Sequence, residues 1–199
     1  MRPASPWGDP VSRIPMLTTD RLVLRPFVAA DLDELAEIHA EESFWWYPLR
    51  RGMTREQTEE FLERVIGRYE SDGFGLEAAV DRGTGAMIGW AGLAVPHFLP
   101  EILPAVEVGW RLASSHHGRG LATEAGAAAL TWGFTEGGLD RIVSIYEPAN
   151  VASGRVMERL GFTHWRTTRG TPQGEEVDVM ELTRARWQER QEEERTRSG

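Results

Sequence analysis

The chain contains no cysteine, which excludes disulfide bonds, a cysteine nucleophile and thiolate metal sites. It also has no block of basic residues. The net charge of −9 comes from 31 acidic against 22 basic side chains, so direct binding to nucleic acid is not expected. An acidic surface would attract a cationic substrate such as an amine, although many acidic proteins have no such substrate.

Long apolar runs are missing as well. No stretch reaches the length of a membrane span, and the proline-rich start lacks the apolar segment of a secretory signal. We therefore expect no membrane partner and a cytoplasmic location. The length of 199 residues suits one domain. We place this domain at 17–182, after a flexible arm at 1–16 and before a charged tail at 183–199.

Strand-like and helix-like patterns alternate along the domain. Helical spacing is expected at 31–42, 54–70, 120–136 and 150–160, and the tail is expected to begin as a helix and fray. Strand patterns are expected at 21–27, 74–80, 86–95, 105–113, 141–146, 162–168 and 175–182. This order predicts an α+β fold with a mixed sheet and helices on its faces. A nucleotide-binding α/β fold is a weaker alternative, because the three consecutive strands in the middle argue against repeated βαβ units.

A glycine-rich loop stands between the strand at 105–113 and the helix at 120–136. Its residues are His117-Gly118-Arg119-Gly120-Leu121-Ala122. Backbone N–H groups of such a loop, at the positive end of a helix, bind phosphate or pyrophosphate. Glycines let the backbone approach the ligand closely. A second motif begins at Asn150-x-x-Ser153 and continues to Leu160-Gly161-Phe162.

These segments, with 17–26, 88–93 and 107–112, together resemble the GCN5-related N-acetyltransferase (GNAT) family and its RimJ/RimL-like branch. The resemblance covers roughly residues 17–182. It implies a mixed, mostly antiparallel sheet of six to seven strands flanked by about four helices. In this family the sheet is splayed between its fourth and fifth strands, which correspond here to 107–112 and 141–146.

The resemblance implies acetyl-CoA as the donor, with its pantetheine arm paired to the fourth strand and its pyrophosphate on the glycine loop. The family loop often begins with Gln or Arg, so His117 makes a side-chain contact there pH-dependent or removes it. The backbone cradle needs no side chain at that position. The residues assigned to the cofactor are Trp110, Arg111, Leu112, His117, Gly118, Arg119, Gly120, Leu121, Ala122, Asn150 and Ser153.

Acetyl transfer to an amine requires a base for the amine proton and stabilisation of the leaving thiolate. Glu107 is the first candidate for the base, and the alternative is a sheet-surface carboxylate paired with an arginine. Glu77 is a rival that we assign to substrate binding. Ser153 is the candidate for the leaving group, and the alternative is a first-turn hydroxyl bonded to backbone. Other branches use a tyrosine where this chain has Met157, and Tyr146 is a substitute for that tyrosine.

The aromatic run at 44–47 lies where the family builds its acceptor pocket. Trp45, Trp46 and Tyr47 are therefore assigned to substrate binding, with core packing as the alternative. No histidine and carboxylate spacing indicates a metal site.

The leading hypothesis is an N-acetyltransferase that transfers the acetyl group of acetyl-CoA directly to a primary amine in a ternary complex. The amine belongs to a protein N-terminus or a small molecule. One alternative keeps the fold with another donor such as succinyl-CoA, and a second is a CoA-binding regulatory protein without turnover. Dimers are common in the family, so a homodimer is one expectation.

Overall fold

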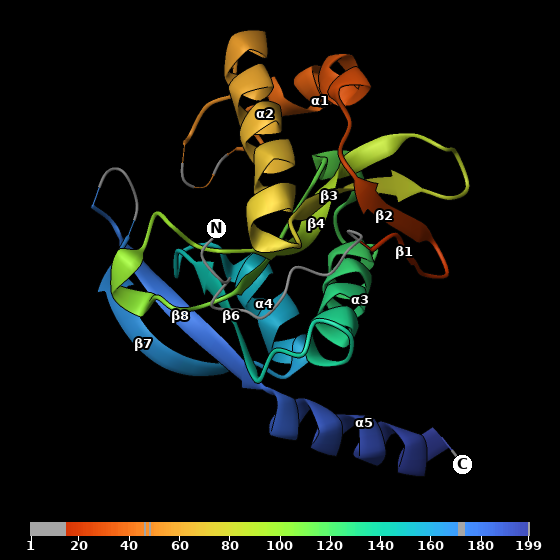
Figure 1. The fold of residues 1–199 in the computed structure, drawn as a ribbon, viewed down its shortest axis with the longest axis vertical. Helices are drawn as coiled ribbons and strands as arrows, with labels where there is room; N and C mark the ends of the chain where they lie inside the picture. The colour runs from red at the N-terminus through yellow and green to blue at the C-terminus, as the bar shows by residue number, and fades with distance from the viewer. Residues whose placement is uncertain (1–14, 46, 48, 171–173, 199) are drawn as a thin grey trace, which may run out of the picture.

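The computed structural model describes residues 15–45, 47, 49–170 and 174–198. They form one eight-stranded sheet in the order β1-β2-β3-β4-β5-β6-β8-β7 (Figure 1). Only β5 and β6 run parallel, and the other neighbouring strands are antiparallel. The strands are β1 (Leu17–Thr18), β2 (Leu22–Pro26), β3 (Leu76–Asp81), β4 (Met87–Ala94), β5 (Glu107–Leu112), β6 (Arg141–Tyr146), β7 (Thr163–Arg169) and β8 (Glu176–Thr183).

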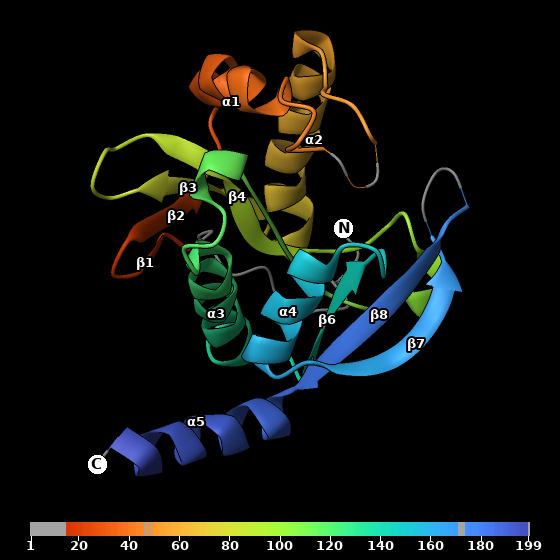
Figure 2. The ribbon, with the colours of Figure 1, turned by 180° about the vertical axis from the view of Figure 1, so that it is seen from behind.

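Helices cover both faces of the sheet, as Figures 1 and 2 show. The α-helices are α1 (Leu32–His39), α2 (Arg55–Asp72), α3 (Leu121–Phe134), α4 (Val151–Leu160) and α5 (Arg184–Ser198). Successive residues of β3 point to opposite faces, which separates two cores. Ala78 packs with α1 and α2, whereas Ala79 packs with α3. Helix α4 joins α3 over β5 and β6, because Val156 and Met157 pack with Val108.

Local sequence signals set the ends of these helices. Thr54 and Gln57 form the expected capping box at the start of α2, and Gly73 ends this helix with a φ of 78°. Asn150 caps α4 by accepting a hydrogen bond from the Ser153 N–H, and Gly161 ends it with a φ of 92°. These caps fix where α2 and α4 present side chains to the site.

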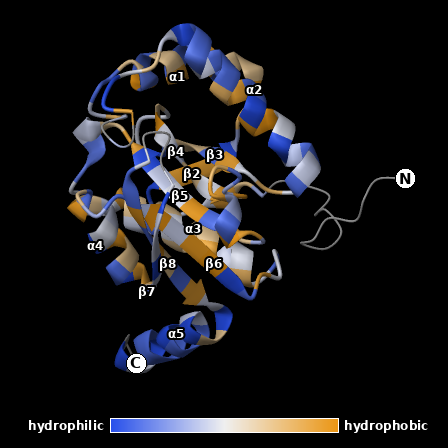
Figure 3. Ribbon diagram, turned by 90° about the vertical axis from the view of Figure 1, so that its left-hand side faces the viewer, coloured by the Kyte–Doolittle hydropathy of each residue, from blue (hydrophilic) through white to orange (hydrophobic). Residues whose placement is uncertain are grey.

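The structure confirms the α+β class but has more strands and more helices than expected. The sheet has eight strands instead of six to seven because residues 17–18 add a short edge strand. A fifth α-helix, α5, comes from the tail and runs to Ser198. It is largely hydrophilic (Figure 3) and is attached by the Trp187 ring, 5.4 Å from that of Phe134. Most of the N-terminal arm, 1–14, lies outside the described residues.

Candidate active site

The site begins where β5 and β6 separate. These parallel strands share one ladder pair, Glu107 with Val143, next to a hydrogen bond from the Val143 N–H to the Val106 carbonyl at 2.8 Å. Further along, the Ser144 hydroxyl donates to the Val108 carbonyl at 3.0 Å. Beyond this point no backbone pairing joins the two strands, so the edge of β5 over Gly109–Arg111 is open toward β6.

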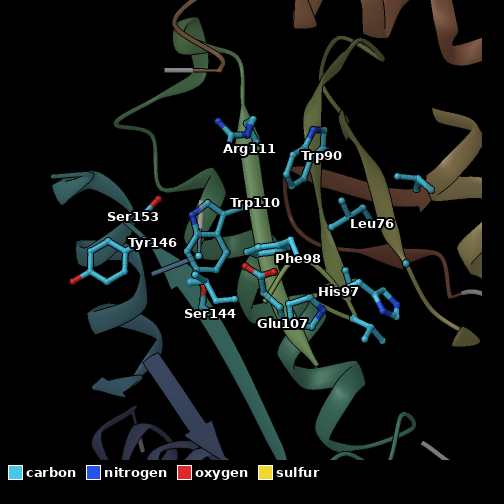
Figure 4. Close-up of a pocket in the computed structure, with 18 of the residues that line it drawn as sticks. Leu76, Trp90, His97, Phe98, Glu107, Trp110, Arg111, Ser144, Tyr146 and Ser153 are labelled. Atoms are coloured by element: carbon cyan, nitrogen blue, oxygen red, sulfur yellow. The ribbon is translucent and has the colours of Figure 1, made fainter. Parts of the chain in front are cut away.

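A cavity of about 550 Å³ fills the opening and continues under α2. Figure 4 shows side chains from several elements around it, including Glu107 and Trp110 of β5, Tyr146 of β6 and Ser153 of α4. The cavity also reaches Tyr47, in the segment between α1 and α2. Glu107, Ser153 and Tyr47, which the sequence analysis selected separately, therefore line one space. Leu112 is 5 % exposed and lies outside the lining.

The glycine loop lies at the start of α3, beyond the open end of β5. Gly118 has a φ of 73° and Gly120 a φ of 77°, in the left-handed region that favours glycine. A Cβ on Gly118 would meet no atom within 4 Å, so the loop borders open space. The N–H groups at the start of α3, from Leu121 and Ala122, have no helical carbonyl to pair with, which suits an anion.

The His117 ring contacts the protein backbone. Its Nε2 lies 2.9 Å from the Leu112 carbonyl oxygen and ties the loop to the end of β5. The expected alternative of a lost side-chain contact at this position therefore fits the structure. The Arg119 side chain makes no hydrogen bond or ion pair with any residue that the structure describes, which leaves it available to a phosphate.

A group of contacts behind the loop, centred on Glu124 and called the clamp below, was not predicted from the sequence. Glu124, in the first turn of α3, accepts hydrogen bonds from the Thr19 hydroxyl at 2.6 Å and the Arg21 N–H at 2.9 Å. The Arg21 guanidinium pairs with the same carboxylate at 2.6 Å and donates to the Arg119 carbonyl at 2.8 Å. The sequence signal was the acidic residue in a helical first turn. Arg21 thus positions the loop from across the sheet.

The opposite wall of the opening comes from α4 and the end of β6. Asn150 and Ser153 line the cavity, and Met157 lies one turn further along, 1 % exposed. The Tyr146 ring packs beside Gly154, where an added Cβ would lie 3.1 Å from it. Burial raises the pKa of Tyr146, and the charges of nearby acidic residues raise it further. Two side chains that carry hydroxyl groups, Ser153 and Tyr146, therefore line this wall.

Glu107 is a half-buried carboxyl group at the start of β5 that lines the cavity. Burial raises its pKa to about 8, against smaller lowering effects of the Ile145 N–H and the Arg111 charge. A carboxyl group with a pKa in this range is suited to remove a proton from an amine near neutral pH.

Glu77 has a similar pKa in a different place. Burial raises the pKa of Glu77 to about 8, and its Oε2 atom has no hydrogen-bond partner. The side chain lies on β3, 2 % exposed, and does not line the cavity. The structure therefore separates the predicted substrate residue Glu77 from Glu107 and Ser153.

The aromatic rings of Phe44 and Trp45 hold the cationic side chain of Arg111. The Arg111 guanidinium carbon lies 4.5 Å from the Trp45 ring centroid and 5.6 Å from that of Trp90. Its Nη1 donates to the Phe44 carbonyl at 2.6 Å. Burial lowers the pKa of Arg111 to about 10, partly offset by the charges of Glu107 and Glu147.

Trp45 and Phe44 are 8 % and 2 % exposed and belong to the core, so the core-packing alternative fits both. Tyr47 lines the cavity, and Trp46, also assigned to the acceptor, lies outside the described residues. The Arg111 side chain also reaches the cavity wall, a position that its assignment by backbone contact did not include.

A second carboxylate group at the cavity, that of Glu147, was also not predicted from the sequence. Arg50 donates to Glu147 Oε2 at 2.6 Å and lies 3.8 Å from Glu175 Oε1. Burial raises the pKa of Glu147, Arg50 lowers it, and Glu175 raises it again. Glu147 directly follows the strand at 141–146, at the end that faces the opening, and this position was the available signal.

Within the part of the chain that the structure describes, no group of three or more histidine or acidic side chains is placed to hold a metal ion. No helix in that part is long and apolar enough to cross a membrane.

Known proteins share both sequence and fold with this chain. The family profile described as acetyltransferase (GNAT) domain matches residues 21–163. The protein YkkB of Bacillus subtilis is 33 % identical over 115 residues, which span 58 % of this chain and 66 % of YkkB. The N-acetyltransferase YnaD of the same organism is 28 % identical over 145 residues, 73 % of this chain and 81 % of YnaD.

Solved structures of other acetyltransferases share the fold of this chain. A structure assigned to the GNAT acetyltransferases of Bordetella pertussis is 30 % identical, with a TM-score of 0.73 over 85 % of this chain and 99 % of its own. RimL, the ribosomal L7/L12 α-N-protein acetyltransferase solved with coenzyme A, shares the fold at 16 % identity, with a TM-score of 0.67 over 85 % of this chain and 98 % of RimL. The chain therefore belongs to the GCN5-related N-acetyltransferase family, whose members are acyltransferases.

Proposed function

We propose that this protein transfers the acetyl group of acetyl-CoA to a primary amine by direct transfer in a ternary complex. The observation that carries this proposal is the single cavity that joins the open edge of β5, Glu107, Ser153 and Tyr47. Donor and acceptor can meet there without a covalent enzyme intermediate, and the chain has no cysteine to form a thioester.

The described residues fit a CoA donor. The opening between β5 and β6 exposes strand backbone that can pair with the amide groups of a pantetheine arm. The loop at Gly118 and Gly120 presents N–H groups to a pyrophosphate, and Arg119 adds a charge. When bound, the donor supplies an activated thioester.

The side chains of the cavity suit the proton transfers of this reaction. Glu107 accepts the proton that the ammonium form must lose, directly or through a water, so that the nitrogen lone pair can attack the thioester carbon. A new C–N bond forms as the C–S bond breaks, the nitrogen then loses its second proton, and the leaving thiolate takes up a proton to give free CoA thiol. The Ser153 hydroxyl donates a hydrogen bond to the leaving sulfur, and Tyr146 is the alternative donor.

The acceptor amine belongs to a protein N-terminus or to a small molecule. RimL acts on a protein N-terminus, which supports the first source by analogy. A different donor such as succinyl-CoA, or CoA binding without turnover, are the alternatives. A cytoplasmic location and a homodimer stay predictions.

An acceptor screen tests the proposal. Free thiol release is measured with acetyl-CoA, succinyl-CoA and a panel of amines that includes peptides with free N-termini. We expect release that depends on both acetyl-CoA and an amine. Release with succinyl-CoA alone would favour the other donor, and CoA binding by calorimetry without release would favour the regulatory protein.

A further inference from the structure

Two arginines of α2 line the cavity without a carboxylate partner. Arg64 and Arg68 lie one helical turn apart on α2, the first exposed and the second partly buried, and line the cavity on the side of α2. Neither forms an ion pair with any residue in the described part of the chain. Arg64 donates weakly to the Glu60 carbonyl at 3.4 Å and lies 5.6 Å from the Phe61 ring.

The Arg68 side chain makes no hydrogen bond with any described residue. Asp72, one turn further, also lines the cavity, but its carboxylate accepts the Ser71 hydroxyl at 2.7 Å instead of pairing with Arg68. Arg55, at the start of the same helix and outside the cavity, does pair with Asp33 at 2.6 Å. Unlike Arg55, the two arginines at the cavity therefore keep guanidinium groups that can bind an anionic ligand.

The other walls of the cavity complement these arginines. Glu107 of β5 and Glu147, just after the end of β6, are carboxyl groups on these walls, and the raised pKa of Glu107 suits it to accept a proton from an amine. Apolar side chains also line the cavity, and the Phe98 ring, 58 % exposed, faces the cavity beside Glu107 (Figure 4). Such a surface matches a ligand that has an amine, a carboxylate and an apolar body.

We infer that the acceptor is an amino acid with an apolar body, whose carboxylate binds Arg64 and Arg68 while its amine lies toward Glu107. This inference rests on the proposed function and names its substrate class. Arginine suits the role because its planar fork can donate two parallel hydrogen bonds to one carboxylate. The cavity volume of about 550 Å³ fits a small ligand beside the end of the donor.

Matched acid and amide acceptors test the inference. Thiol release from acetyl-CoA is measured with phenylalanine, leucine and 6-aminohexanoate, with the amide of each, and with a peptide that has a free N-terminus and an amidated C-terminus. We expect kcat/KM for the acids to exceed that for the amides about tenfold, as for a hydrogen-bonded charge pair. Arg68→Gln should remove this preference by lowering the acid values about tenfold. Arg55→Gln is the matched control and should change neither series.

Equal use of acids and amides by the wild-type protein would overturn the inference, and so would an equal loss for both series in Arg68→Gln. Acetylation of the peptide without the amino acids would overturn it while the proposed function stands. Failure of every amine, together with no CoA binding by calorimetry, would overturn the proposed function itself. CoA binding retained by Arg68→Gln shows that the variant is folded.

Discussion

Glu107 and Glu77 are two carboxyl groups whose pKa burial raises to about 8. They differ in what they face. Glu107 opens into the cavity, whereas Glu77 is enclosed on β3. At the residue scale, a shifted pKa therefore selects a catalytic base only together with access to the substrate.

Glu107→Gln should lower kcat/KM by about 100-fold, because general base catalysis contributes about this much. In the wild-type protein only the deprotonated carboxylate acts as the base, so activity should fall as pH decreases below about 8. The variant should lose the part of this dependence that comes from Glu107 and keep the part that comes from protonation of the amine. The measurement is kcat/KM between pH 6 and 9, and an unchanged rate and profile would remove Glu107 from the role of base.

Ser153→Ala should lower kcat by about tenfold or more, because a hydrogen bond to the leaving sulfur is lost in the transition state. The KM of the acceptor should change little. Tyr146→Phe, on the same wall, is the comparison and should retain most of the activity. The reverse pattern, with the larger loss in Tyr146→Phe, would assign the leaving-group contact to the tyrosine.

At the scale of elements, the loop before α3 combines a conformational and a chemical requirement. Gly118 has a φ of 73°, and Gly85, in the turn between β3 and β4, has a φ of 74°. An added Cβ would meet nothing within 4 Å at either position. The two glycines therefore have the same conformational requirement, and only Gly118 borders the proposed pyrophosphate site.

Gly118→Ala and Gly85→Ala should each reduce the free energy of unfolding by about 1 kcal/mol, from the left-handed backbone. Only Gly118→Ala should weaken CoA binding, because its Cβ would hold the phosphates away. Thermal unfolding and calorimetry with CoA measure the two effects. Equal CoA affinity in both variants would show that the loop does not bind the pyrophosphate.

Signals close together in the sequence predicted the elements well. The capping pair Thr54 and Gln57, the Asn150 cap and Gly161 are local, so the sequence alone locates the ends of α2 and α4. Glu107 and Ser153 were selected one at a time, and only the structure shows that both line one cavity. The burial of Trp45 around Arg111 did not follow, because it depends on which face of the sheet α1 and α2 cover.

Long-range side-chain contacts escaped the sequence for the same reason. The Arg21–Glu124 clamp joins residues 103 positions apart, and the Arg50–Glu147 pair joins residues 97 apart. No periodic pattern indicates such pairs, since each requires the sheet to be assembled first. Glu77 was a rival to Glu107 and was assigned to substrate binding, but alternation along β3 turns it away from the cavity.

At the scale of the whole molecule, buried carboxyl groups make stability depend on pH. The folded-state pKa of Glu77 is about 8 and its ordinary value is 4.5. Between these values the folded chain holds the proton more strongly than the unfolded chain. This contribution to stability is therefore complete below pH 4.5 and is lost as pH rises through about 8.

Glu77→Gln should stabilise the protein at pH 9 by about 1–3 kcal/mol relative to wild type, because a neutral amide replaces a buried charge. The gain should shrink toward pH 5. Thermal unfolding at both pH values measures it, and kcat/KM should stay near the wild-type value because Glu77 lies outside the cavity. A gain that does not depend on pH would contradict the shifted pKa.

The composition of the whole chain lowers the background of the thiol-release assay. All 22 basic residues are arginine, so the protein offers no lysine amine to its own donor. Thiol release in the presence of an added amine therefore reports transfer to that amine with little background from self-acetylation.

The most direct test of the account is a grid of initial rates in which acetyl-CoA and an active amine acceptor are varied together. Direct transfer in one cavity predicts double-reciprocal lines that intersect, because both substrates are bound before the C–S bond breaks. Parallel lines, with exchange of label between acetyl-CoA and CoA in the absence of acceptor, would indicate an acetylated enzyme. That result would contradict the ternary complex.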